Sequence, residues 1–291
     1  MRRFAEAGIR PRTKLGQNFL IDLNLLRLLH RTARIGPDDV VLEVGTGTGS
    51  LTTLMAKDAA VVVTVELDPR MFQLAGEELH RFQNVRMLQI DALKNKGRLS
   101  PVLLEAVGKE LDAAPDRQFK LVANLPYNIA TPLLGNLLAL DRPPASMTVT
   151  IQKELADRIA ARPATKDYGA LSIWIQSQCR VEIVRVMPPS AFWPRPKVHS
   201  AIVQIVLDPA LRGRIPDRQF FHDFIRSMFF HRRKFLRSEL LSAMKEQLDK
   251  PSVDRILDEL GLDGTARAEE LEVAAMLALC ERVRAEVGGP T

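Results

Sequence analysis

The sequence predicts a doubly wound α/β fold with a mostly parallel sheet, an antiparallel hairpin at one sheet edge and a small helical domain at the C-terminus. Short runs rich in Val, Ile and Leu alternate with helix-like stretches from about residue 38. These runs are almost continuously apolar, as in strands that are covered on both faces. After residue 208 no strand-like run follows, and the sequence has a helical period.

The predicted parallel strands come one after another, with a helix or loop between successive strands. The first strand covers 39–44, and a glycine-rich turn separates it from a helix at 50–58. A second strand lies within 59–68, and Pro69 then begins a helix, because proline is favoured at the first helical position. The remaining parallel strands lie within 85–91, 120–127 and 146–152.

The last two strand-like runs predict the edge hairpin. Ranges 181–188 and 199–207 follow one another without a helix between them, which is typical of an antiparallel pair. Helix-like sequence comes next, at 220–244 and 253–261. We therefore expect two domains, listed by their bounds: 1–208, with a basic N-terminal arm, and 209–291.

Composition excludes several classes of protein. No apolar run approaches the roughly 18 residues of a membrane span, and the charged N-terminus has no apolar stretch of the kind found in secretory signals. Cys179 and Cys280 lie far apart without clustered Cys or His, which indicates neither a disulfide framework nor a zinc site. We expect a cytoplasmic monomer with no metal and no membrane partner; an organellar transit peptide is the weaker alternative.

Positive charge is concentrated in two segments. Residues 1–37 hold eight Lys and Arg against two acidic residues, and 231–237 hold four basic residues in seven positions. Such clusters favour a polyanion partner, because binding to phosphates releases counterions. A solvated helix face is the alternative for either cluster alone.

Glycine and acidic residues follow the first three strands, at the end of an open α/β sheet where ligands bind. Gly45, Gly47 and Gly49 are spaced G-x-G-x-G, one residue short of the dinucleotide fingerprint. Glu66 stands where a carboxylate can accept both ribose hydroxyls, and Asp91 can accept from an adenine amino group. A glycine turn, an acid for the ribose and an acid for the base, in that order along the chain, predict a pocket for an adenosine without phosphates. S-adenosylmethionine fits such a pocket, and acidic strand ends tolerate its positively charged sulfonium.

The fourth strand ends in Asn124-Leu125-Pro126-Tyr127. The exocyclic amine of adenine is a poor nucleophile, because its lone pair is delocalised into the ring. Acceptors on its N–H groups, for which we expect the Asn124 side-chain oxygen and the Leu125 carbonyl, favour the geometry in which this lone pair can attack a methyl group. Pro126 helps to aim that carbonyl, and Tyr127 can stack on the base.

With these motifs the chain resembles the ribosomal RNA adenine dimethyltransferases that act on the small subunit. The similarity runs from about residue 14 to the last helices, in KLGQNFLID, LEVGTGTGSLT, VELD, QIDAL, NLPYNIAT, IQKELADRI, YGALSIWIQ, PPSAFWPRPKVHSAIV, HRRKFLR and RAEEL. The resemblance implies a Rossmann-like methyltransferase sheet. It also implies dimethylation of two adjacent adenines near the 3′ end of small-subunit RNA, on a pre-30S particle during ribosome assembly.

The resemblance also implies roles for single residues. Asn18 and Leu20 would cover the cofactor, and Gly45 would contact its methionine part. Asn124 would lie between the cofactor and the target amine, with Glu66 and Asp91 on the ribose and the adenine as above. Phe192 would sandwich the flipped adenine together with Tyr127. RNA contacts are expected from the N-terminal arm and from the following basic residues: Arg195, Lys197, Arg232, Arg233 and Lys234.

The sequence departs from the family pattern in three places. Thr46 stands where proline is common, His199 stands where Asp or Asn is usual, and the segment 95–116 lengthens the spacing before Asn124. We expect that segment to form an enlarged surface helix and loop. Two alternatives stay open: a macrolide-resistance type enzyme acting on large-subunit RNA, and a nucleic-acid-binding factor that keeps the fold without the chemistry.

Overall fold

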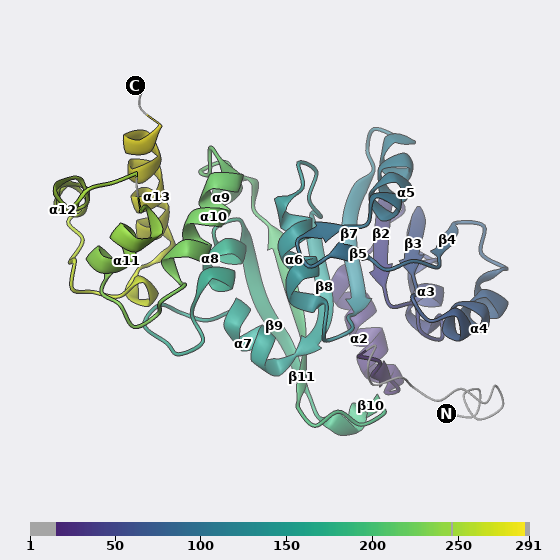
Figure 1. Ribbon diagram of the computed structural model, residues 1–291. Coiled ribbons are helices and arrows are strands. Elements are labelled where there is room, and N and C mark those ends of the chain that lie inside the picture. The colour runs from purple at the N-terminus through teal and green to yellow at the C-terminus, as the bar shows by residue number, and fades with distance from the viewer. Residues whose placement is uncertain (1–15, 246, 289–291) are drawn as a thin grey trace. The chain divides into compact units, whose positions relative to one another are not determined.

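The computed structural model describes residues 16–245 and 247–288 (Figure 1). The predicted N-terminal basic arm lies in residues 1–15, outside the described part of the chain. No helix of the described ranges has the length and apolar character needed to cross a membrane.

The chain divides into two compact units, which we describe separately. The first unit contains the chain up to Ala156 together with Val181–Val206. The second contains Asp157–Arg180 and the chain from Leu207 onward. The division near residue 207 lies close to the boundary expected from the sequence, but the assignment of 157–180 to the second unit differs from the predicted domains.

A seven-stranded sheet in the order β4-β3-β2-β7-β8-β11-β9 forms the centre of the first unit (Figure 1). Its strands are β2 (Asp39–Val44), β3 (Val61–Val65), β4 (Val85–Leu88), β7 (Gln118–Asn124), β8 (Ser146–Gln152), β9 (Cys179–Met187) and β11 (Ser200–Leu207). The pairs β2 with β3, β3 with β4, β2 with β7 and β7 with β8 are parallel, and β11 is antiparallel to β8. The predicted mostly parallel sheet with antiparallel edge strands is therefore confirmed.

Helices cover both faces of this sheet. On one face α2 (Leu23–Ala33) and α3 (Ser50–Met55) share a core with Val41, Val62 and Val122. On the other, α5 (Pro101–Asp112) and α6 (Ala130–Ala139) lie beside Leu42 and Phe119. Neighbouring strand residues thus point to opposite covered faces, which explains the continuous apolar runs.

Aspartate residues cap two helices of the first unit, α4 (Pro69–Leu79) and α2. Asp68 accepts from the N–H of Arg70 and precedes Pro69, the first residue of α4. Asp22 caps α2 in the same way, by accepting from two backbone N–H groups. Such side chains satisfy donors that an isolated helix end leaves unpaired, so the helices begin where the sequence places these residues.

Two short pairs of strands add to the first unit. The strand β1 (Phe19–Leu20) pairs antiparallel with β10 (Phe192–Trp193), which a 3₁₀ turn (Pro189–Ala191) precedes. The strands β5 (Leu93–Asn95) and β6 (Arg98–Leu99) form a hairpin ahead of α5. The long segment before Asn124 therefore forms this hairpin and α5, whose Leu103, Val107 and Leu111 are buried.

Helices make up the second unit. After α7 (Lys153–Ile159), which crosses the division, they are α8 (Ala170–Gln176), α9 (Pro209–Arg212), α10 (Arg218–Met228), α11 (Leu236–Ala243), α12 (Lys250–Glu259) and α13 (Val273–Val287), with a 3₁₀ turn at Ala268–Glu270. The helix-like range 220–244 is split by a turn at 229–235, which contains the basic sequence HRRK.

Candidate active site

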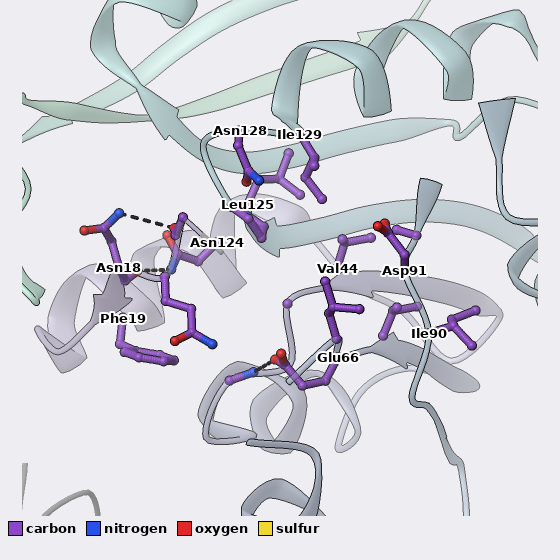
Figure 2. Close-up of a pocket in the computed structure, with 18 residues that line it drawn as sticks. Asn18, Phe19, Val44, Glu66, Ile90, Asp91, Asn124, Leu125, Asn128 and Ile129 are labelled. Atoms are coloured by element: carbon purple, nitrogen blue, oxygen red, sulfur yellow. Dashed lines mark hydrogen bonds between the residues drawn. The ribbon is translucent and has the colours of Figure 1, made fainter. Parts of the chain in front are cut away.

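A pocket opens at the carboxyl ends of the central strands, at the point where the chain continues to β3 on one side of β2 and to β7 on the other (Figure 2). Open α/β sheets bind their ligands at this reversal. The described residues that line it are Gly16, Gln17, Asn18, Phe19, Val44, Gly45, Gly47, Val65, Glu66, Leu67, Ile90, Asp91, Ala92, Asn124, Leu125, Pro126, Asn128 and Ile129. Five of the predicted cofactor residues are therefore brought together here, and Leu20 is the exception.

The glycine turn after β2 adopts a backbone that only glycine takes readily. Gly45 has φ +90° and Gly47 has φ +56°. A Cβ on Gly47 would lie 3.3 Å from the ring of Phe19, so the turn and the N-terminal segment approach each other closely. Side chains at these positions would strain the backbone and fill the space beside the pocket.

Glu66 holds this turn in place and also lines the pocket. Its Oε2 accepts from the N–H of Gly47 at 2.9 Å, and its Oε1 accepts from the N–H of Asp68 at 2.9 Å. Burial raises the pKa of Glu66, and the two backbone donors act in the opposite direction. Each carboxylate oxygen keeps a second lone pair, so the group can still accept from a diol.

A hydroxyl network beneath the turn ends on a second buried carboxyl group. The hydroxyls of Thr52 and Thr64 donate to Oε2 of Glu43 at 2.5 and 2.6 Å, and Thr46 shares a 2.6 Å hydrogen bond with Thr64. Burial raises the pKa of Glu43 to about 8. Thr46, which stands where the family commonly has proline, also donates its N–H to Val65 at 3.2 Å. The departure from the family pattern thus supplies two additional bonds to β3.

Asp91 lies on the pocket wall after β4 and is exposed. Its Oδ1 accepts from the N–H of Leu93 at 2.9 Å, which fixes the orientation of the side chain. Apolar residues also line the pocket: Val44 at the end of β2, Val65 at the end of β3 and Ile90 just after β4. The wall therefore combines carboxylate acceptors with apolar surface, as an uncharged heterocycle with hydroxyl and amino donors requires.

Asn124 ends β7 at this pocket with its amide held in one orientation. Its Nδ2 donates to the backbone carbonyl of Asn18 at 2.8 Å (Figure 2). Because a carbonyl can only accept, this bond fixes which side of the amide is nitrogen. Its Oδ1 is buried and has no hydrogen-bond partner among the described residues. An unpaired buried acceptor is costly, so this oxygen is suited to receive an N–H from a ligand.

The segment Gly16–Phe19 contributes more to the pocket than its sequence indicates. Gly16 has φ +65°, and a Cβ there would meet Oδ1 of Asn128 at 2.8 Å. Phe19 lines the pocket and stacks on Trp193, with 6.4 Å between the ring centroids. Sequence reasoning missed Phe19, because the pairing of β1 with β10 that positions it joins two-residue strands. The same pairing sets Leu20 opposite Phe192.

The two predicted base-stacking rings differ in exposure, and neither lines the pocket. Tyr127 is half-buried, and its hydroxyl shares a 2.5 Å hydrogen bond with that of Ser200. Phe192 is 2% exposed and packs in the core with Leu26, Leu29 and Ile202. A base could stack on Phe192 only after its ring had moved out of this core.

The predicted RNA contacts lie on two different turns. Arg195 and Lys197 are exposed, just beyond β10 in the first unit. Arg233 and Lys234 are exposed on the turn between α10 and α11. No ion pair involves any of these four among the described residues. They are therefore available to phosphates.

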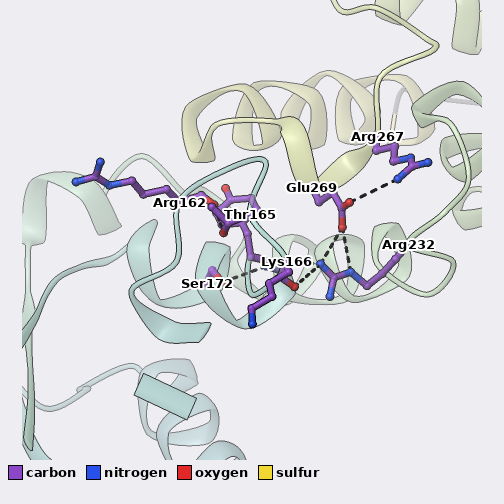
Figure 3. Close-up of polar contacts among 9 residues, drawn as sticks. Arg162, Thr165, Lys166, Ser172, Arg232, Arg267 and Glu269 are labelled. Atoms are coloured by element: carbon purple, nitrogen blue, oxygen red, sulfur yellow. Dashed lines mark hydrogen bonds and ion pairs between the residues drawn. The ribbon is translucent and has the colours of Figure 1, made fainter. Parts of the chain in front are cut away.

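Arg232 is engaged inside the second unit instead. Its guanidinium donates to Glu269 at 2.8 and 3.1 Å and to the backbone carbonyls of Lys166 and Tyr168 at 3.0 and 2.9 Å (Figure 3). Tyr168 is in turn buried and donates its hydroxyl to the carbonyl of Leu271 at 3.0 Å. Arg232 thus ties the loop before α8 to the turn before α13.

Within the described residues there is no cluster of His, Cys, Asp or Glu that could hold a metal ion. Cys179 and Cys280 are both buried as free thiols, and burial raises the pKa of each. His199 is exposed, and the structure gives it no place in the pocket.

Comparison with known proteins identifies relatives along nearly the whole chain. A family model described as ribosomal RNA adenine dimethylase matches residues 8–283. The ribosomal RNA small subunit methyltransferase A of Geobacillus thermodenitrificans is 36% identical over 276 residues, which cover 94% of this chain and 92% of that protein. The protein of the same name from Lactiplantibacillus plantarum is 40% identical over 276 residues, covering 94% and 90%.

Solved structures agree in fold. A dimethyladenosine transferase from Plasmodium falciparum superimposes with a TM-score of 0.74 at 24% identity, covering 90% of this chain and 95% of the other. The 23S rRNA methyltransferase ErmE superimposes with a TM-score of 0.62 at 24% identity, covering 91% and 99%. At these identities the two structures show a shared fold and no more.

Proposed function

The chain belongs to the ribosomal RNA adenine dimethylase family, and from this premise we propose that it dimethylates the exocyclic amines of two adjacent adenines near the 3′ end of small-subunit ribosomal RNA. The methyl donor would be S-adenosylmethionine, and the substrate would be a pre-30S particle during ribosome assembly. The proposal rests on the names of relatives that match nearly the whole chain and on a pocket whose polar groups suit this chemistry.

The residues present fit S-adenosylmethionine, which supplies an electrophilic methyl group on a positively charged sulfur. Glu66 would accept from the ribose hydroxyls with its free lone pairs, and Asp91 would accept from the adenine amino group. Gly45 would leave room for the methionine part, since it carries no Cβ. Asn18 would cover the cofactor from the segment that precedes β1. Leu20 would act from behind this segment, because it does not line the pocket.

Within the pocket, the single structural observation that supports the proposed chemistry best is the fixed Oδ1 of Asn124, which has no partner among the described residues. It is suited to accept one N–H of the target amine, and the carbonyl of Leu125 would accept the other. Both acceptors favour the pyramidal amine that can attack a methyl group. Such a preorganised polar site acts without a strong base, because the methylated amine releases its proton to water.

The target adenine would stack on Tyr127, whose ring follows directly in the chain and is anchored through Ser200. Stacking of Phe192 on the other face of the adenine stays a prediction, because the Phe192 ring lies in the core. A Phe192→Leu variant tests it. If the ring leaves the core to stack, kcat/KM for RNA falls about ten-fold, and an unchanged value assigns Phe192 to packing alone.

RNA would be held by phosphates at the exposed basic residues, namely Arg195, Lys197, Arg233 and Lys234. Folded RNA is recognised largely by shape and backbone, so these residues would act together. Arg232 would support the surface indirectly, since its guanidinium is bonded within the second unit. We expect the enzyme to work as a monomer in the cytoplasm, where small subunits are assembled.

The test is transfer of radiolabelled methyl groups to undermethylated 30S particles, followed by primer extension to map the modified nucleotides. The proposal predicts labelling of two adjacent adenines near the 3′ end of the small-subunit RNA, with fully methylated 30S particles as the control. Labelling of large-subunit RNA instead would favour a resistance-type enzyme. A chain that binds particles but labels neither RNA would be a binding factor.

A further inference from the structure

The turn between α10 and α11 exposes two aromatic rings beside its basic residues. The side of α10 formed by Phe221, Phe224 and Met228 is buried. The chain then turns, and Phe230 is 79% exposed and Phe235 is 54% exposed. Exposed aromatic rings that flank exposed cations are typical of surfaces that bind single-stranded nucleic acid.

A pocket adjoins this turn. The described residues that line it are Asp223, Arg226, Ser227, Phe230, His231, Glu239, Ser242 and Ala243. Its volume of about 460 Å³ lies in the range of ligand-binding clefts, roughly 300–1,000 Å³. Its lining residues all belong to the second unit, and none of them lines the pocket at the strand ends.

Glu239 is a buried carboxylate residue that lines this pocket. The side chain is 2% exposed, and its Oε1 accepts from the N–H of His231 at 3.2 Å and lies 3.4 Å from Nδ1 of the same residue. Its Oε2 is buried and has no hydrogen-bond partner among the described residues. A carboxylate oxygen removed from water needs a donor, and the pocket is where a ligand could supply one.

We propose that this pocket receives an unpaired guanine of the RNA substrate. Guanine is the base whose Watson–Crick edge presents two adjacent N–H donors, which match a carboxylate. Phe230 offers an exposed face for the base to stack on, and Arg226 lies beside it to contact a phosphate. The inference rests on the proposed function and deepens it, because it assigns a base-specific contact away from the methylated adenines.

Charges of both signs surround the pocket: Asp223, Glu239 and Arg226 line it, and Arg233 and Lys234 lie on the adjoining turn. Arg226, Arg233 and Lys234 are exposed, and no ion pair involves them among the described residues. These three basic residues attract the phosphates of an RNA strand, while the two carboxylates suit the N–H donors of a base edge. The other bases present one amino or one imino group on the Watson–Crick edge, so they pair with a carboxylate less completely.

The experiment measures fluorescence anisotropy of the full chain with three labelled heptanucleotides: UUUGUUU, UUUAUUU and UUUUUUU. We expect the guanine-containing RNA to bind about ten-fold more tightly than the other two. Glu239→Gln keeps an oxygen for the N–H of His231 but turns an amide NH₂ toward the guanine donors, so the preference should disappear. Phe230→Ser should weaken binding of the guanine RNA by a similar factor.

The matched control is Phe235→Ser, which removes an exposed ring that does not line the pocket and should keep the guanine preference. Melting temperatures verify that Glu239→Gln is folded, and Phe230→Ser changes a surface residue and provides an independent readout. Equal binding of the three RNAs, or a preference that survives Glu239→Gln, would overturn the inference. Displacement of the guanine RNA by a lysine peptide of equal concentration would instead indicate a protein partner.

The two proposals fail in different ways. Methyl transfer to adenines with no guanine preference would leave the enzyme assigned and the pocket without this role. A guanine preference without methyl transfer to any RNA would support the pocket and refute the enzymatic function.

Discussion

Replacing Glu43 with glutamine tests whether a neutral carboxyl group lies beneath the glycine turn. Glu43 is 1% exposed, and its Oε2 accepts from two threonine hydroxyls. Glutamine has the same size and keeps an oxygen that can accept both bonds, so the network survives the change. What glutamine removes is the ability to ionise.

The magnitude follows from the pKa of this group. Burial raises the pKa of Glu43 to about 8 from its ordinary value of 4.5. Between these values the unfolded chain has lost a proton that the folded chain retains. The stabilisation is therefore complete below pH 4.5 and is lost as the pH rises to about 8. At about 1.36 kcal/mol per pH unit, the separation corresponds to at most about 5 kcal/mol of unfolding free energy.

The assay is urea unfolding between pH 5 and 9, with and without the Glu43→Gln substitution. In a Trp174→Phe background, Trp193 is the remaining tryptophan and reports on the unit that contains Glu43. The glutamine protein should be nearly as stable as the glutamate protein at pH 5 and increasingly more stable toward pH 9. The exposed Glu77→Gln is the control and should leave the pH profile unchanged. Parallel pH profiles for the proteins with and without Glu43→Gln would refute a carboxyl group held neutral by burial.

Three further predictions concern the active site and the RNA surface. Asn124→Ala should keep cofactor affinity but lower kcat roughly 10²–10³-fold in the methyl-transfer assay, and near-normal turnover would remove Asn124 from the mechanism. Tyr127→Phe should retain most activity despite losing the bond to Ser200, whereas Tyr127→Leu should lose about ten-fold in kcat/KM for RNA; equal losses would argue against stacking. Combined Arg233→Ala and Lys234→Ala should reduce the salt dependence of particle binding by about 1 to 2 in slope without changing cofactor affinity, and an unaltered slope would contradict phosphate contacts there.

Sequence patterns predicted the parts of the fold that depend on local chemistry. The apolar range 39–44 coincides with β2, and 146–152 coincides with β8, because strands covered on both faces have a distinctive composition. The glycine-rich turn and the acidic residues after the strands predicted the pocket, because ligands bind at the carboxyl ends of the strands in open α/β sheets. Strand composition and turn residues can each be recognised within a single segment of the sequence.

What the sequence did not predict depends on contacts between distant segments. The strands β1 and β10 are two residues long, so no periodicity indicates them, yet they bring Phe19 to the pocket. Arg232 belongs to a basic cluster in the sequence, but its bonds to Glu269 and to the carbonyl of Tyr168 come from other parts of the chain. Residues 157–180 contain α8 and the loop before it, and only tertiary contacts assign them to the second unit.

The pairing of β1 with β10 also changes how substitutions near residue 193 should be interpreted. This ribbon connects the segment whose carbonyl orients Asn124 to the loop that carries Arg195. A phosphate bound at that arginine would act, through the paired residues, on the segment next to the Asn124 amide. Loss of turnover after a change in this loop is therefore no proof of a lost RNA contact, since a displaced amide would give the same result.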